Sequence, residues 1–161
     1  MRQLCYLAAT VLFLFSSCVS SHYPIDKVPC VQLNPALLGT WKINETSERN
    51  NSIIISRKSA YEYMVEYAQG GNKGSEFFNA YISEIDHNYF INFSSAKDTV
   101  KDYMFFRILY VSKTGDRFKL AIVGDTTMRE VKDAAKIRAT ISRNLLKSDF
   151  YSDTTELFRI R

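Results

Sequence analysis

From Gly39 onward the sequence is divided into short apolar or alternating segments, each followed by a polar or glycine-bearing turn. Short segments rich in β-branched and aromatic side chains are typical of β-strands. This pattern predicts a chain that is mostly β, which its ten tyrosines and eleven phenylalanines also favour. The strands expected before the pattern changes are residues 39–44, 52–57, 61–67, 76–85, 89–94, 103–112 and 117–123.

The hydrophobic period changes between Asp125 and Lys147. Apolar residues recur there at helical spacing, and basic residues lie between them. A helix is predicted from Met128 to Leu146, with Asp125 or Thr126 as its N-cap. The apolar positions of this helix are Met128, Val131, Ala135, Ile141 and Leu145. One further strand, residues 155–160, ends the predicted order and brings the strands to eight.

Eight successive strands joined by short connections predict an all-β fold, an up-and-down antiparallel barrel with one α-helix before the last strand. Closure of a barrel removes the exposed strand edges that an open meander would leave. We expect the last strand to pair with the first and the helix to cap one end of the barrel. A sandwich of two sheets is the alternative architecture.

The first residues have the features of a secretory signal. One positive charge, Arg2, precedes an uncharged apolar run over residues 4–15, and two small residues follow. As a helix this run would span about 18 Å, less than the ~30 Å hydrocarbon core of a bilayer. We expect residues 1–17 to be a signal peptide, residues 18–36 a flexible tether containing all three prolines, and residues 37–161 one barrel domain.

The residues Phe15-Ser16-Ser17-Cys18 resemble the lipobox of bacterial lipoproteins, in which cleavage occurs before a cysteine that becomes lipidated. The resemblance implies that Cys18 is the first mature residue and carries acyl chains such as palmitate. Cys18 would then anchor the protein to a membrane of the bacterial cell envelope, and we expect the outer membrane. Cys30 would be a lone thiol, expected to be partly buried. Ordinary secretion, with Cys18 and Cys30 free to form a disulfide, is the alternative.

The motif Gly39-Thr40-Trp41 resembles the Gly-x-Trp signature of lipocalins and related calycins. The resemblance implies that Gly39 permits a sharp entry into the barrel and that Trp41 packs across its closed end. In that family an arginine of the last strand often packs on the tryptophan, and Arg159 and Arg161 are the positions available. Residues 37–161 are similar in pattern to small lipocalin-like lipoproteins of bacterial envelopes.

No catalytic, metal or cofactor site is predicted. His22 and His87 are far apart in the sequence, and neither a nucleophile elbow nor a phosphate-binding loop is present. The formal net charge is +4, and the basic residues are scattered rather than clustered, so nucleic-acid binding is not expected. We expect a monomeric protein that is not an enzyme and has no cofactor.

Tyrosine-rich strand faces are the functional feature of the predicted barrel. Strict alternation places Tyr61, Tyr63, Val65 and Tyr67 on one face, and the longest apolar run offers a counterpart with Arg107 outside. An eight-stranded barrel is either filled by side chains or holds one small ligand. The main hypothesis is a small hydrophobic or amphipathic ligand, and the alternative is a filled barrel acting as a protein-interaction or structural module of the envelope. The candidate ligand-binding residues are Tyr61, Tyr63, Tyr67, Phe106 and Tyr110.

Overall fold

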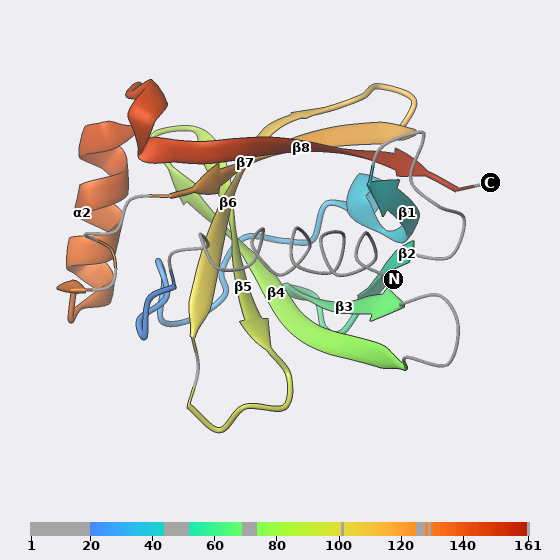
Figure 1. The fold of residues 1–161 in the computed structure, drawn as a ribbon, viewed down its shortest axis with the longest axis horizontal. Helices are drawn as coiled ribbons and strands as arrows, with labels where there is room; N and C mark the ends of the chain where they lie inside the picture. The colour runs from blue at the N-terminus through green and yellow to red at the C-terminus, as the bar shows by residue number, and fades with distance from the viewer. Residues whose placement is uncertain are drawn as a thin grey trace, which may run out of the picture.

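The computed structural model describes residues 20–43, 52–68, 74–100, 102–124, 128 and 130–160. In these residues eight antiparallel strands follow one another around a closed barrel (Figure 1). A short 3-10 helix η1 (Pro35–Leu37) precedes the barrel, and helix α2 (Ala134–Asn144) and 3-10 helix η3 (Ser148–Phe150) precede the last strand. The strands are β1 (Gly39–Ile43), β2 (Ser52–Arg57), β3 (Glu62–Ala68), β4 (Ser75–Ile85), β5 (Asn88–Ser95), β6 (Tyr103–Val111), β7 (Arg117–Val123) and β8 (Tyr151–Arg159). The predicted fold class is confirmed.

The barrel is closed by pairing of the first and last strands, as expected. Trp41 of β1 lies opposite Arg159 of β8 in an antiparallel register. Each connection joins neighbouring strands, so the connections alternate between the two ends of the barrel. The tightest is the two-residue turn between β4 and β5, where Asp86 and His87 have φ values of 48° and 60°. Left-handed conformation at both central residues is the turn geometry that matches the twist of a hairpin.

The inner face of the barrel holds one apolar core. Residues that lie opposite each other on neighbouring strands share a face of the sheet. Tyr63 of β3 lies opposite Ala80 of β4, which lies opposite Phe93 of β5, so all three face the inside of the barrel. Trp41 and Phe118 are almost fully buried in this core. The buried members of the cluster are Leu37, Trp41, Tyr63, Val65, Ala80, Ile82, Phe118 and Leu157.

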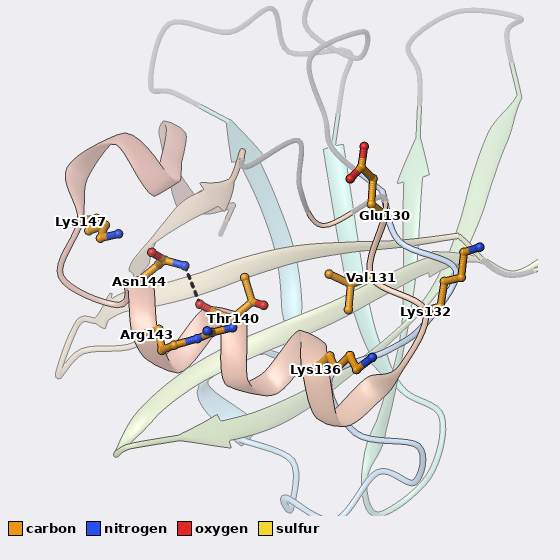
Figure 2. Close-up of a pocket in the computed structure, with 8 residues that line it drawn as sticks. All are labelled: Glu130, Val131, Lys132, Lys136, Thr140, Arg143, Asn144 and Lys147. Atoms are coloured by element: carbon orange, nitrogen blue, oxygen red, sulfur yellow. Dashed lines mark hydrogen bonds between the residues drawn. The ribbon is translucent and has the colours of Figure 1, made fainter.

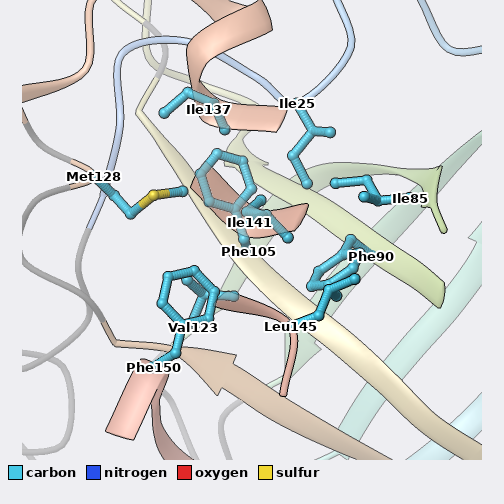
Figure 3. Close-up of a cluster of buried hydrophobic side chains, with 10 residues drawn as sticks. All are labelled: Ile25, Ile85, Phe90, Phe105, Val123, Met128, Ile137, Ile141, Leu145 and Phe150. Atoms are coloured by element: carbon cyan, nitrogen blue, oxygen red, sulfur yellow. The ribbon is translucent and has the colours of Figure 1, made fainter. Parts of the chain in front are cut away.

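A second apolar core lies on the outer face of β4 to β6 (Figure 3). Phe90 and Phe105 are adjacent in sequence to the inward-facing Ile91 and Phe106, so they point to the outside of the barrel. Helix α2 covers Phe90 and Phe105 with Ile137 and two further apolar side chains. The helix therefore packs against the outside of the barrel wall and does not cap an end, contrary to our expectation. The buried residues of this cluster are Ile25, Ile85, Phe90, Phe105, Val123, Met128, Ile137, Ile141, Leu145 and Phe150.

Helix α2 is shorter than predicted. It begins at Ala134, and the side chain of the N-cap residue Asp133 accepts a hydrogen bond of 2.8 Å from the backbone N–H of Ala135. Met128 and Val131 precede the helix, but they also pack on the outer core. Their spacing therefore resembles that of a helical face, and the predicted helix extended too far toward the N-terminus. The N-cap predicted at Asp125 or Thr126 lies outside the described residues.

The N-terminal segment, residues 20–38, lies against the barrel rather than acting as the flexible tether predicted for residues 18–36. Ser21 forms two backbone hydrogen bonds with Tyr103 at the start of β6, of 2.9 and 2.7 Å. Ile25 is 2% exposed in the outer core, and Asp26 forms a bidentate ion pair with Arg138 of α2. Cys30, expected to be partly buried, is exposed. The predicted signal peptide and Cys18 lie outside the described residues.

Candidate functional site

One end of the barrel is closed around the single tryptophan. Trp41 is fully buried, and its Nε1–H donates a 2.9 Å hydrogen bond to the carbonyl oxygen of Leu37 in η1. Phe118, next to the β6–β7 turn, meets the indole edge to face with ring centroids 4.6 Å apart. The guanidinium of Arg159 lies 4.3 Å from the ring centroid, which is a cation–π contact. These groups seal the end of the barrel that carries the β2–β3, β4–β5 and β6–β7 connections.

Arg159 holds the chain entry in place as well as covering Trp41. Its guanidinium donates to three backbone carbonyl oxygens, those of Gly115, Leu38 and Ala36, at 2.6, 2.7 and 2.9 Å. Gly39 has a φ of +132°, and a Cβ at this position would collide with the same guanidinium. Glycine is therefore required here for both its conformation and its size. Arg161, the other arginine that the resemblance offered, lies outside the described residues.

Near this closed end a cleft of about 550 Å³ opens between β5 and β6. The two strands are paired from Ser94 and Tyr103 as far as Phe90 and Arg107. Beyond Arg107, β6 continues to Val111 without pairing to β5. The N-terminal segment lies across the gap. The residues lining the cleft are Val31, Gln32, Leu33, Asn34, Ile82, His87, Asn88, Tyr89, Arg107, Ile108, Leu109, Tyr110 and Val111.

The cleft has an apolar wall and a polar rim. Ile82, Ile108 and Val111 belong to or pack against the inner core, so the cleft reaches the inside of the barrel. Arg107 lies at the rim, where its guanidinium donates to the Leu145 carbonyl, the Tyr151 hydroxyl and the Asn88 side-chain oxygen. These acceptors are neutral, so within the described residues no carboxylate balances the charge of Arg107.

Aromatic side chains continue the inner face toward the other end of the barrel. Phe78 and Phe93 stack with ring centroids 4.5 Å apart, and Phe106 meets Phe93 edge to face at 5.7 Å. Phe78 follows the β3–β4 connection and Phe93 precedes the β5–β6 connection, so both lie at the end opposite Trp41. All three are only partly buried, unlike the fully buried Trp41. The aromatic rings at this end therefore keep some solvent-exposed surface.

The structure places the predicted ligand-binding residues in three different environments. Tyr63, Tyr67 and Phe106 share the inner face, because their register partners are inner-core residues. Tyr61 precedes β3 and is 39% exposed. Tyr110 lines the cleft, but its hydroxyl bonds to Glu156 on the outer surface. The register shifts between Ile108 and Tyr110, and this bulge reverses the parity that simple alternation assigned to Tyr110.

Sequence reasoning missed a buried polar group that fixes the N-terminal segment. Asn92 of β5 is 1% exposed and accepts a 2.8 Å hydrogen bond from the backbone N–H of Ile25. Its amide nitrogen donates to the hydroxyl of Ser83 at 2.8 Å. Next to it, the Tyr81 hydroxyl donates to the carbonyl oxygen of Asp26 at 2.5 Å. A lone asparagine in an apolar strand was the available signal, but its partner could not be inferred.

Alkaline pH is expected to weaken the fold through two buried tyrosines. Burial raises the pKa of Tyr63 and of Tyr81, and neighbouring Tyr103 and Asp26 raise that of Tyr81 further. In the unfolded chain both hydroxyls ionise near pH ~10, so their contribution to stability is complete below that pH and is lost as pH rises above it. The free energy of unfolding should fall by up to ~1.4 kcal/mol per pH unit for each group.

Denaturant unfolding measured at about pH 9, 10 and 11 checks this expectation. Tyr81→Phe should flatten the decline, since the ionisable hydroxyl is gone. An unchanged slope in that variant would contradict the assignment to Tyr81.

The fold and the cleft define a closed antiparallel β-barrel whose apolar interior is reached from its surface. No protein-family model, curated protein or solved structure matches the chain. Among the described residues, no helix is long and apolar enough to cross a bilayer. In the same residues, no three His, Cys, Asp or Glu side chains group as a metal site would require.

Proposed function

We propose that the barrel binds a small hydrophobic or amphipathic molecule, and that a lipid on Cys18 holds the protein at a membrane of the bacterial envelope. The cleft between β5 and β6 supports the first part. Its volume of about 550 Å³ lies within the ~300–1,000 Å³ of ligand pockets. Ile82, Ile108 and Val111 provide an apolar surface that such a molecule would cover. Binding of this kind needs no catalytic group, so the proposal is a binding protein and not an enzyme.

The rim of the cleft favours an amphipathic ligand over a purely apolar one. Arg107 brings a positive charge whose partners within the described residues are three neutral oxygens and the Tyr151 ring, with no carboxylate among them. Asn34 and Asn88 add further hydrogen-bonding groups at the same rim. A ligand with an apolar tail and an anionic or polar head would match both parts, because its head stays paired while its tail leaves water.

Native mass spectrometry of the full-length protein, purified in detergent from a bacterial host, tests ligand binding. We expect an added mass of one small molecule, which organic extraction then assigns to a chemical class. Ile108→Trp should fill the cleft and lower occupancy about tenfold, a change of ~1.4 kcal/mol in binding free energy. Val100→Trp is the matched control, because Val100 is 70% exposed and lies away from the cleft.

A clean apo mass would count against the ligand proposal if a panel of added fatty acids also failed to bind. The alternative, a filled barrel that acts on a protein partner, would then be favoured. Leu109, Tyr110 and Tyr89 support that alternative, because they are exposed around the same rim.

The intact mass of the same sample tests the lipid anchor. Cleavage before Cys18 would remove residues 1–17, and acylation would add the mass of its lipid chains. Two or more chains give stable membrane attachment, whereas one gives only marginal binding. A protein cut at another site, with a disulfide between Cys18 and Cys30, would contradict the proposed anchor.

A further inference from the structure

The solvent-facing side of α2 carries a cationic surface (Figure 2). A shallow depression of about 950 Å³ lies there, and its polar lining includes Thr140 and Asn144. We call the four basic residues of its lining the cationic face: Lys132, Lys136, Arg143 and Lys147. Glu130 is the acidic residue of the same lining.

The cationic face follows from the periodicity of the helix. Ala134, Ile137 and Ile141 are the buried residues of α2, and the two isoleucines belong to the outer core, so the opposite side of α2 is left to solvent. Lys136 and Arg143 are seven residues apart and therefore share that side. The remaining two basic residues of the face flank the helix, one just before its start and one just after its end. Residues that are scattered in the sequence are thus gathered by folding.

Within the described part of the chain, the positive charges of this face are not neutralised by carboxylates. Among the described residues, Lys132, Lys136, Arg143 and Lys147 form no ion pair. The printed side-chain bond of Arg143 is to the Ala139 carbonyl of its own helix. Arg138 is the contrast, because Asp26 neutralises it. A surface with several unpaired cations has a positive potential that attracts anionic partners.

The first described residues, from Ser20, lie on the same side of the barrel as the cationic face. Ile25 and Val131 pack in one outer core with α2. Tyr103 also packs against that core, and it pairs with Ser21. Because two residues can span at most ~7 Å, a lipid on Cys18 would enter the membrane close to Ser20.

We infer that the cationic face of α2 lies on the anionic phospholipid headgroups of the membrane that holds Cys18. The inference rests on the proposed lipid anchor and adds an orientation to it. Basic residues near an anionic surface strengthen attachment additively, and their attraction falls off within a Debye length. The orientation directs the β2–β3 and β6–β7 connections away from the bilayer, since they lie at the barrel end opposite the β5–β6 connection beside Ser21.

Lysine acetylation measured residue by residue on the lipidated full-length protein tests the inference. The protein is reconstituted into vesicles of phosphatidylcholine with or without phosphatidylglycerol. On the anionic vesicles we expect Lys132, Lys136 and Lys147 to react about fivefold more slowly, the effect of one surface cation. Salt at ~0.5 M should remove the protection by screening. Lys58 and Lys113, in the β2–β3 and β6–β7 connections, are internal controls whose rates should not change.

Two matched double variants distinguish an effect of the cationic face from an effect of the net charge of the protein. Lys136→Glu with Arg143→Glu should abolish protection of Lys132 and Lys147. Lys58→Glu with Lys113→Glu changes the net charge equally and should leave that protection intact. Equal rates at all lysines on both vesicle types, or protection by soluble heparin but not by vesicles, would overturn the inference. Intact mass distinguishes the lipid-anchor proposal from the orientation inferred here. An unlipidated Cys18 overturns both the anchor and the orientation, and a lipidated protein whose lysines are not protected overturns the orientation alone.

Discussion

Trp41→Ala is expected to lower the free energy of unfolding by about 3–5 kcal/mol, the usual cost of truncating a buried large aromatic residue. The indole is fully buried, contacts Phe118 and lies under the guanidinium of Arg159. Its removal leaves a cavity at the closed end and deprives the Leu37 carbonyl of a donor. It also leaves the Arg159 charge without its aromatic partner.

Chemical denaturation followed by far-UV circular dichroism measures this effect, because the variant lacks the only tryptophan for fluorescence. Tyr89→Ala is the control. Tyr89 is 44% exposed, so its truncation should change stability by no more than ~0.5 kcal/mol. Equal losses in the two variants would show that Trp41 does not hold the closed end together.

Asn92→Ala is expected to lower the free energy of unfolding by about 2–4 kcal/mol and to loosen the N-terminal segment. The variant leaves the Ile25 N–H without its acceptor and removes the amide that donates to Ser83. Each buried polar group left unpaired costs ~1–3 kcal/mol. The loss should be largest near Ile25, because that backbone crosses the outer face of the barrel at Asn92.

Hydrogen exchange followed by mass spectrometry measures the local effect, and denaturant unfolding measures the global one. Exchange of the peptide covering residues 20–28 should accelerate more than exchange of β2 and β3. Asn79→Ala on β4 is the control, since the Asn79 side chain makes no hydrogen bond to the other described residues. Uniform acceleration over the whole chain would contradict a specific role for Asn92 in holding the segment.

Strand order and strand positions could be predicted because they depend on local chemistry. Alternation of side chains in segments such as β3, bounded by turn residues, indicates a half-buried strand without knowledge of its partners. The start of β8 is the exception. Residues 152–154 are polar and give no alternating signal, and pairing with β7, from Tyr151 opposite Val123 onward, is what makes this segment a strand.

The faces of β6 could be predicted only in part. In β6 both faces carry large apolar residues, since the inner core covers Ile108 and the outer core covers Phe105. Alternation is weak where both faces are buried, so periodicity cannot say which residue faces a ligand. The bulge after Ile108 then moved Tyr110 to the other side. The cleft that Tyr110 lines could not be predicted either, because it too depends on this irregular pairing of β6.

The sequence by itself determined the strands, their count and the presence of a helix before the last strand, and the Gly-x-Trp resemblance implied the roles of Gly39 and Trp41. The strands and the helix follow from periodicity, which acts over a few positions. Only the tertiary structure decided that residues 20–38 cover the barrel, that α2 lies on its outer wall and that Arg159 binds the carbonyl oxygens of Ala36, Leu38 and Gly115. Each depends on contacts between residues distant in the chain, whose energy comes from burial and pairing that no local pattern records.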